Sequence, residues 1–339
     1  MLNNKNYMVL LSVCLLVAST RAAEPEVGDY RCIETLHEQD MVDFIAFSPN
    51  GRLFVSVSEE NIIKLWNAEN YECMRTWQEQ SGYYGHAHSV VKIAFSPNGR
   101  LLASTSVNNT IKLWDMENYE CIRTLSYGND RITSIAFSPS GRLLASISMN
   151  NTIKLWDMEN YECVRTLRHG NERITSIAFS LDGRLFASAS KDGTIKLWDV
   201  ENYEGIYLWH ANHDYIKSIA FNHDGSMLAS ASFDGTIKLW SMGNYECRIL
   251  GGHASCVTSI AFNFDGSMLI SASTDRTIRL WNVDDGECVC ILKGHTGYVN
   301  SIAFSLDHST LASASCDETI KFWDLTSFES AMPRFKFID

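Results

Sequence analysis

One unit of about forty residues recurs seven times along this chain of 339 residues. Every copy contains the tripeptide Ile-Ala-Phe, which starts at residues 45, 93, 135, 177, 219, 260 and 302, so successive copies are 48, 42, 42, 42, 41 and 42 residues apart. This period is typical of β-propeller blades rather than of helical solenoids. Because the repeat fills nearly the whole chain, we expect residues 30–339 to form one closed domain whose core is made by the contacts between units.

Each unit offers four short strand-like segments. In the third unit they cover residues 134–137, 143–146, 152–156 and 162–167, and the residues between them are rich in Gly, Asn, Pro and Ser. Such residues form the tight turns of β-hairpins, so the pattern predicts an antiparallel four-stranded sheet. A sheet with two apolar faces needs a neighbour on both sides, which a ring provides. The predicted fold class is therefore all-β, a seven-bladed β-propeller with four-stranded antiparallel blades.

The two ends of the repeat array predict how the ring closes. Residues 29–36 match residues 118–125, the expected outer strand of a later unit, whereas the last unit's own candidate, residues 327–330, runs into Pro333. Proline is poorly suited to a strand ladder. We therefore expect residues 30–36 to complete the blade built from residues 299–325, which removes an exposed sheet edge.

The N-terminus resembles a secretory signal peptide. A short apolar run over residues 8–18 follows Lys5, and the small residues Thr20 and Ala22 suit a cleavage site after Ala22. The run is too short to span a membrane. We expect residues 1–22 to be a cleaved signal that directs the protein to the secretory pathway; the alternative is a cytoplasmic protein with an apolar tail. On the secretory route, Asn108 and Asn150 would be glycosylation acceptors.

The charge of the chain disfavours nucleic acid as a partner. The formal net charge is −12 at pH 7, and it becomes −14 without residues 1–22, which carry Lys5 and Arg21 but no acid. A protein that binds a phosphate backbone needs a basic face, which an acidic chain of this kind lacks.

The cysteines predict neither disulfides nor a metal site. Five of the ten stand at one repeat position, on equivalent strands of different blades: Cys73, Cys121, Cys163, Cys247 and Cys288. A disulfide needs Cα atoms within roughly 7 Å. We also find no Cys/His spacing typical of zinc, no phosphate-binding loop, and no Gly-x-Ser-x-Gly or His-Glu-x-x-His motif. We expect no cofactor, no metal and no catalytic residue.

The units resemble the WD-repeat family over about residues 30–339. The family signature runs from Gly-His to Trp-Asp, and it is present as Gly252-His253 to Trp281-Asn282 and as Gly294-His295 to Trp323-Asp324. The family forms β-propellers, and seven units imply seven blades. The resemblance also implies a hydrogen-bonded structural tetrad in the sixth and seventh units, formed by His253, Ser271, Asp275 and Trp281, and by His295, Ser313, Asp317 and Trp323.

The first three units depart from this tetrad. Glu60, Asn108 and Asn150 stand where later units have aspartate, and His86 adds a third histidine at the family position. A buried polar group that loses its partner costs about 1–3 kcal/mol. We therefore expect the first three blades to be held less tightly.

The resemblance implies that partners bind at one rim of the ring, where the seven units differ most. By repeat position, that rim holds an arc of cationic and aromatic residues of the types that dominate interface hot spots: Arg131, Arg173, Lys191, Tyr215, Phe233 and Tyr298. An acidic-aromatic or phosphorylated peptide would suit this arc. The alternative is a solvated rim, because Asp130, Glu172 and Asp214 stand next to these residues.

We therefore expect a non-enzymatic scaffold that binds a protein or peptide on the propeller rim, as a monomeric ring within a larger complex. The alternative is a propeller-fold enzyme with its active site in the central channel. That alternative requires a buried acid or base with a perturbed pKa in the channel, and the repeats do not point to one.

Overall fold

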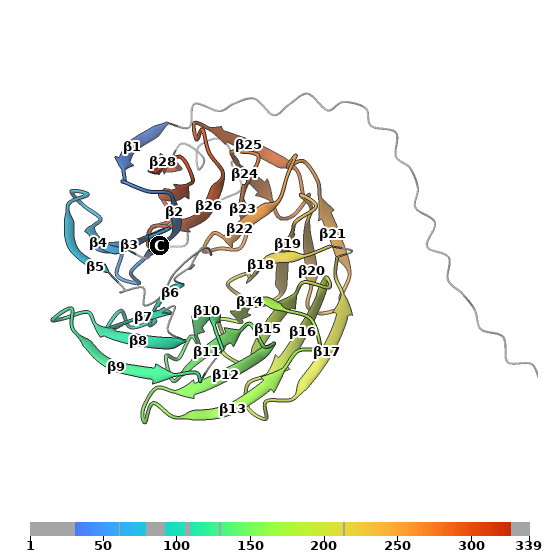
Figure 1. Cartoon of the computed structure of the whole chain (residues 1–339). Coiled ribbons are helices and arrows are strands. Elements are labelled where there is room, and N and C mark those ends of the chain that lie inside the picture. The colour runs from blue at the N-terminus through green and yellow to red at the C-terminus, as the bar shows by residue number, and fades with distance from the viewer. Residues whose placement is uncertain are drawn as a thin grey trace, which may run out of the picture.

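A computed structural model describes residues 31–60, 62–78, 92–105, 109–128, 130–212 and 214–326. The 28 strands in these ranges form seven four-stranded sheets, which follow one another around a ring with a central opening (Figure 1). The structure is the all-β seven-bladed propeller that the repeat predicts.

The blades are numbered in chain order. Blade 1 contains β2 (Val42–Phe47), β3 (Leu53–Ser58), β4 (Ile62–Asn67) and β5 (Cys73–Gln78). Blade 2 contains β6 (Ile93–Phe95), β7 (Leu101–Thr105), β8 (Thr110–Asp115) and β9 (Cys121–Ser126). Blade 3 contains β10 (Ile132–Phe137), β11 (Leu143–Ser148), β12 (Thr152–Asp157) and β13 (Cys163–Arg168). Blade 4 contains β14 (Ile174–Phe179), β15 (Leu185–Ser190), β16 (Thr194–Asp199) and β17 (Gly205–His210).

Blade 5 contains β18 (Ile216–Phe221), β19 (Met227–Ser232), β20 (Ile237–Ser241) and β21 (Cys247–Leu250). Blade 6 contains β22 (Val257–Phe262), β23 (Met268–Ser273), β24 (Thr277–Asn282) and β25 (Cys288–Lys293). Blade 7 contains β26 (Val299–Phe304), β27 (Thr310–Ser315), β28 (Thr319–Asp324) and β1 (Cys32–His37). The first strand of each blade borders the central opening, and the fourth lies at the periphery (Figure 1).

The N-terminal strand closes the ring. Strand β1 pairs antiparallel with β28, with Cys32 opposite Trp323 and His37 opposite Thr319. This confirms the predicted closure by residues 30–36. The innermost strands close as well, because the Asn300 side-chain amide donates to the Val42 carbonyl across the same seam (3.0 Å).

The turn between the first and second strands shows why the sequence Ser-Pro-Asn-Gly-Arg recurs. In blade 1 the Ser48 hydroxyl accepts the Leu53 N–H (3.0 Å), and the Asn50 side-chain oxygen accepts the Arg52 N–H (3.0 Å). Gly51 has a φ of 68°, a region that glycine enters without steric cost. These residues end one strand and start the next.

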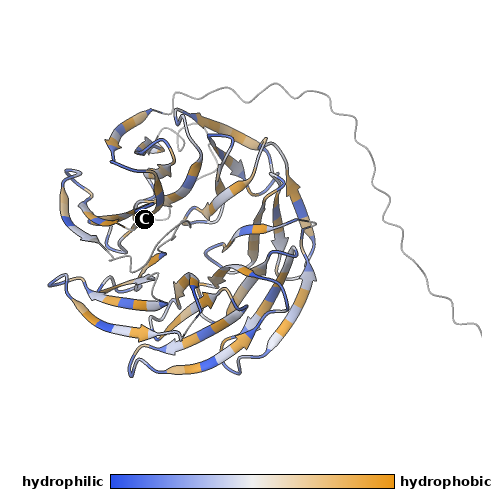
Figure 2. Cartoon of the chain, viewed as in Figure 1, coloured by the Kyte–Doolittle hydropathy of each residue, from blue (hydrophilic) through white to orange (hydrophobic). Residues whose placement is uncertain are grey.

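The core is divided among the seams between blades. At one seam, Ala145 and Ile147 of blade 3 pack against Ile174, Phe186 and Trp198 of blade 4. All five side chains are buried, so a blade alone would expose an apolar face on each side. In Figure 2, hydrophobic and hydrophilic residues follow one another along the outer strands at the edge of the ring, where one face meets water.

Candidate partner-binding face

The sixth and seventh blades each hold four polar side chains in one hydrogen-bonded chain. In blade 6 the His253 Nδ1 lies 2.8 Å from an Asp275 carboxylate oxygen, and its Nε2 lies 2.7 Å from the Ser271 hydroxyl. The Trp281 indole N–H donates to the same hydroxyl (2.8 Å). In blade 7, His295, Asp317, Ser313 and Trp323 form the same chain, with distances of 2.9, 2.7 and 2.8 Å.

The electrostatics of these tetrads suit cohesion. Burial lowers the pKa of His253 and of His295, although the hydrogen bond to aspartate opposes this in part. Burial by itself raises the pKa of Asp317, but hydrogen bonds from Thr319, the Thr296 N–H and His295 hold that pKa well below its usual range. A neutral histidine therefore faces an ionised carboxylate inside the blade.

All seven blades share the inner half of this arrangement. In each, the tryptophan indole N–H donates to the hydroxyl of a buried serine ten residues earlier, at 2.8–3.0 Å. This pair joins the second strand of a blade to the third. The residue that approaches it from the incoming loop differs among the blades.

In blades 1, 3, 4 and 5 the incoming loop brings a different residue to the shared serine or to the threonine beside it. Glu38 bonds Ser56 in blade 1 (3.2 Å), and it also pairs with the Lys64 ammonium. In blade 3 the Tyr127 hydroxyl contacts Thr152 (3.1 Å). In blade 4 His169 contacts both Ser188 (2.6 Å) and Thr194 (2.9 Å). In blade 5 Asn212 accepts from Ser230 (3.3 Å).

Sequence alignment by position missed His169, because it precedes its serine by 19 residues whereas His253 precedes its own by 18. The pKa of His169 is lowered to about 4, mainly by burial; Asp192 opposes this shift, and Lys196 adds to it. His86 and Asn108, which the sequence comparison also named, lie outside the described residues.

Asn150 keeps part of the role that aspartate has in other blades. Its side-chain oxygen accepts the N–H and hydroxyl of Thr152 at 3.2 and 2.6 Å. Asp192 holds Thr194 in the same way at 3.0 and 2.5 Å. The two side chains differ in charge. Asn150 is neutral, and its amide N–H also donates to Asp130.

Backbone hydrogen bonds bring the predicted rim residues together in pairs. The Lys191 N–H donates to the Arg173 carbonyl (2.9 Å), and the Phe233 N–H donates to the Tyr215 carbonyl (2.8 Å). The incoming loop and the turn after the second strand are therefore adjacent within a blade. Arg131 and Tyr298 hold the equivalent loop positions in blades 3 and 7, where they accept from Met149 and Cys316.

Four side chains from blades 4 and 5 form one continuous cluster on this rim, which we call the rim cluster: Lys191, Tyr215, Lys217 and Phe233. The Tyr215 and Phe233 rings stack with centroids 6.2 Å apart. The ammonium groups of Lys191 and Lys217 lie 5.5 and 5.9 Å from the centroid of the Tyr215 ring. Phe233 is 55% exposed. Sequence reasoning missed Lys217, which lies inside an inner strand.

The comparison with protein families agrees with this geometry. A family model described as "WD domain, G-beta repeat" matches seven times, over residues 30–67, 73–115, 119–157, 161–199, 206–241, 244–282 and 286–324. Together these segments cover more than half of the chain. The chain belongs to the WD40 repeat family. A comparison with curated proteins gave no match.

The central opening of this WD40 propeller holds a lysine whose pKa is perturbed. The Lys92 ammonium lies 4.7 Å from the centroid of the Phe44 ring. The pKa of Lys92 is lowered to about 8, mainly by burial and also by the charge of Lys217, while Asp43 opposes the shift. Lys217 belongs to blade 5 and Lys92 directly precedes β6 of blade 2, so two like charges act on each other from different blades. The repeat pattern did not point to Lys92, because the other units do not have a lysine at that position.

Cysteines, metal-ligating groups and membrane-spanning helices were the remaining features sought in the described ranges of the WD40 ring. Nine cysteines there are free thiols, and Cys73, Cys121, Cys163 and Cys247 are exposed. No group of three or more His, Cys, Asp or Glu side chains in those ranges is arranged to hold a metal ion. No helix in the same part of the chain is long and apolar enough to cross a membrane.

Proposed function

We propose that this WD40 propeller is a non-enzymatic scaffold that binds a protein or peptide partner through the rim cluster. WD40 propellers generally serve as protein-interaction scaffolds. The observation that carries the finer proposal is the stack of Phe233 on Tyr215 with two lysine ammonium groups over the same tyrosine. An exposed aromatic surface with two cations suits a partner that offers both an aromatic ring and negative charge.

The preferred ligand is an acidic-aromatic or phosphorylated peptide. Its aromatic side chain would pack on Phe233, and its carboxylate or phosphate would pair with Lys191 and Lys217. Arg173 is a third cationic residue beside this surface, because its backbone carbonyl accepts the Lys191 N–H. Charged partners at a rim raise association rates and make binding sensitive to salt.

Two of the acids beside the rim cations have other partners. An Asp214 carboxylate oxygen accepts the Tyr215 N–H (2.7 Å), and Asp130 accepts from the Asn150 amide. Both carboxylates keep their negative charge in these contacts, so a solvated rim neutralised by the acids of the incoming loops is still the alternative to a peptide site.

Peptide binding to the full chain tests this proposal. An array of acidic-aromatic and phosphorylated peptides is screened for binders, and the best is titrated against Lys191→Glu/Phe233→Ala and Arg131→Glu/Arg173→Glu. Leu181→Ala/Arg184→Glu is the matched control, because both residues are exposed in a turn of blade 4 between its first and second strands. We expect at least a tenfold loss for the rim variants and none for the control. Unchanged binding in the rim variants would exclude this surface.

Lys92 supports the alternative of an enzyme with its active site in the central channel. An amine with a pKa of about 8 is partly unprotonated at neutral pH, as nucleophilic and basic lysines require. A screen of hydrolase and transferase substrates decides between the scaffold and the enzyme. Turnover that Lys92→Met abolishes would replace the scaffold proposal.

For the cellular compartment there are two alternative proposals, a secretory form and a cytoplasmic form. Residues 1–22 and Asn108 lie outside the described residues, and the secretory route rests on the sequence alone. The free exposed thiols support the cytoplasmic form, because oxidising compartments favour disulfides. Sequencing the mature N-terminus distinguishes them: a start at Ala23 supports the secretory form. Mass photometry checks the predicted monomeric ring.

A further inference from the structure

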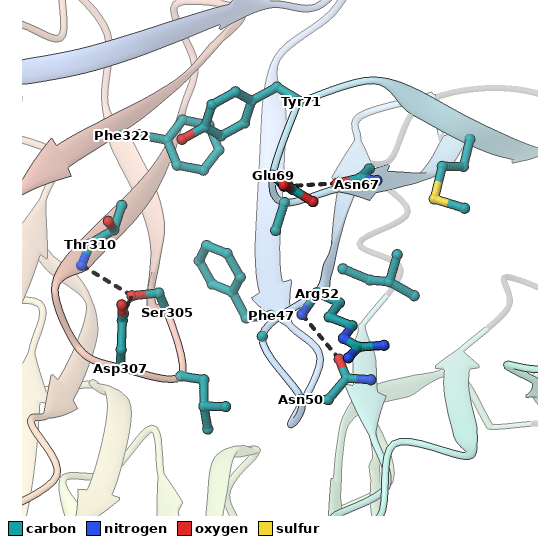
Figure 3. A pocket seen from close by; sticks show the side chains of 15 residues that line it. Phe47, Asn50, Arg52, Asn67, Glu69, Tyr71, Ser305, Asp307, Thr310 and Phe322 are labelled. Carbon is teal, nitrogen blue, oxygen red and sulfur yellow. Dashed lines mark hydrogen bonds between the residues drawn. The ribbon is translucent and has the colours of Figure 1, made fainter.

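A cavity of about 740 Å³ opens at the seam where blade 7 meets blade 1. Its walls include the aromatic rings of Phe47, Tyr71 and Phe322 and the side chains of Met74 and Leu306. Figure 3 shows Phe47 between the Ser305–Thr310 turn of blade 7 and the Asn50 and Arg52 side chains of blade 1. Met74 is 45% exposed and Leu306 is 59% exposed, so apolar side chains at this seam face solvent.

The repeat is altered at this seam. At three other seams an arginine of the outer strand lies over a tyrosine of the next blade, as Arg75 does over Tyr119 (5.8 Å). Here β1 supplies Glu34 at the arginine position. Tyr71 instead packs on Phe322, with ring centroids 4.6 Å apart. The closing strand thus leaves its seam without the cation that lies over the tyrosine at those other seams.

The chain leaves the ring beside this cavity. The Leu325 N–H donates to the Ser309 carbonyl (2.8 Å), and Ser309 lies between two lining residues, Asp307 and Thr310. Thirteen further residues, 327–339, follow Thr326 in the sequence. An extended chain spans about 3.3 Å per residue. Residues 327–335 can therefore reach roughly 30 Å from Thr326.

The sequence of this segment complements the cavity. Residues 332–338 read Met-Pro-Arg-Phe-Lys-Phe-Ile, with two cations and no acid. In an extended conformation Phe335 and Phe337 point to one side and Arg334 and Lys336 to the other. Two acids, Glu69 and Asp307, and one arginine, Arg52, line the cavity.

We propose that residues 332–338 dock in the seam cavity of the same chain, with Phe335 and Phe337 against its aromatic wall and the cations beside Glu69 and Asp307. The C-terminal segment then covers Met74 and Leu306 and ties blade 7 to blade 1. The docked segment is then a second connection, in addition to β1, across the seam between blade 7 and blade 1. The proposal is independent of the rim cluster, which lies on blades 4 and 5.

Hydrogen exchange on the full chain is the first test. The wild type is compared with Phe335→Ser/Phe337→Ser at two protein concentrations. We expect backbone amides of residues 67–74 and 305–310 to exchange at least tenfold faster in the variant, and those of blade 4 to be unchanged. Equal exchange in both proteins would overturn the proposal. Protection that grows with protein concentration would assign the cavity to a second copy, and would also overturn it.

Binding in trans is the second test, and it does not depend on the variant's stability. A fluorescein-labelled peptide of residues 327–339 is titrated into the full chain that carries Phe335→Ser/Phe337→Ser. We expect saturable binding that Met74→Asp weakens at least tenfold. Ile206→Asp is the matched control, because Ile206 is a similarly exposed apolar residue of an outer strand, in blade 4. Binding that is absent, or that Met74→Asp leaves unchanged, would refute docking at this seam.

Discussion

Asp317→Ala removes the acceptor at the centre of the blade 7 tetrad. One carboxylate oxygen of Asp317 accepts from His295 Nδ1 (2.9 Å) and from the Thr296 N–H (2.8 Å). The other accepts the Thr319 N–H (3.1 Å) and the Thr319 hydroxyl (2.5 Å). The His295 side chain is almost completely buried, so its ring nitrogen has no access to water after the substitution.

The expected loss of folding stability follows from the four hydrogen bonds that Asp317 accepts. A buried polar group without a partner costs about 1–3 kcal/mol. The substitution leaves His295 Nδ1 with only its longer contact to the Thr319 hydroxyl (3.3 Å), and it also removes the acceptor of the Thr296 N–H, the Thr319 N–H and the Thr319 hydroxyl. We expect the free energy of unfolding to fall by about 3 kcal/mol. Asn150→Ala breaks contacts to Thr152 and Asp130. The buried Thr152 hydroxyl keeps its contacts to Tyr127 (3.1 Å) and Ser148 (3.0 Å), so about 1 kcal/mol is expected.

Thermal melting and urea unfolding of the two variants measure this difference. Asp275→Ala is the matched control, because Asp275 makes the same contacts to His253 and Thr277 in blade 6. We expect Asp317→Ala and Asp275→Ala to be similar and both to exceed Asn150→Ala. Equal losses for Asp317→Ala and Asn150→Ala would refute the claim that the charged tetrad stabilises a blade more than its uncharged counterpart.

Three further predictions concern closure and titration. Deletion of residues 24–36 removes most of β1 and should lower the melting temperature sharply; an unchanged melting temperature would contradict closure by that strand. The pKa of His169 is about 4 in the fold and about 6.5 in an unfolded chain, so the unfolded state binds more protons between these values and stability falls as pH falls from 6.5 to 4. His169→Asn should flatten that part of the stability profile, and an unchanged slope in urea unfolding would argue against a buried neutral histidine. NMR of ¹³C-dimethylated lysines should show Lys92 titrating near pH 8, and Lys217→Met should raise that pKa because it removes a like charge.

The fold could be predicted from the sequence because the signal was repeated. Seven copies of similar turn residues and of the same tryptophan specify seven equivalent sheets, and the match of residues 29–36 to a later outer strand specifies the closure. Residues 32–37 form that strand. Each blade depends mainly on its own turns and on its two neighbours, so a local pattern is sufficient to fix the ring.

The site could be predicted only in part, because its chemistry depends on where units differ. The expectation that Arg173 and Lys191 lie on the same rim followed from repeat position, whereas the contact of Lys217 with Tyr215 did not. The inner strands carry a register shift, for example between Ile216 and Ser218, and such a bulge redirects side chains. Lys92 has a low pKa because of burial and a charge from another blade, and neither is visible in a single unit.

The residues that replace the tetrad histidine bear on how the rim is held. Blades 6 and 7 hold their incoming loops with a charged aspartate, whereas blade 5 holds its own with Asn212, whose contacts to Ser230 and Thr236 are neutral and long, at 3.3 and 3.4 Å. Hydrogen bonds to charged groups are about twice as strong as neutral ones. Tyr215 lies three residues after Asn212 on that loop, and the Lys238 ammonium holds the same loop through the Ala211 carbonyl (2.5 Å), so the rim cluster stands on a loop whose side-chain contact to the buried serine is neutral. A surface of this kind can adjust to a partner at low cost, and replacing Asn212 with histidine should therefore stabilise the ring while slowing the adjustment of Tyr215 to a bound peptide.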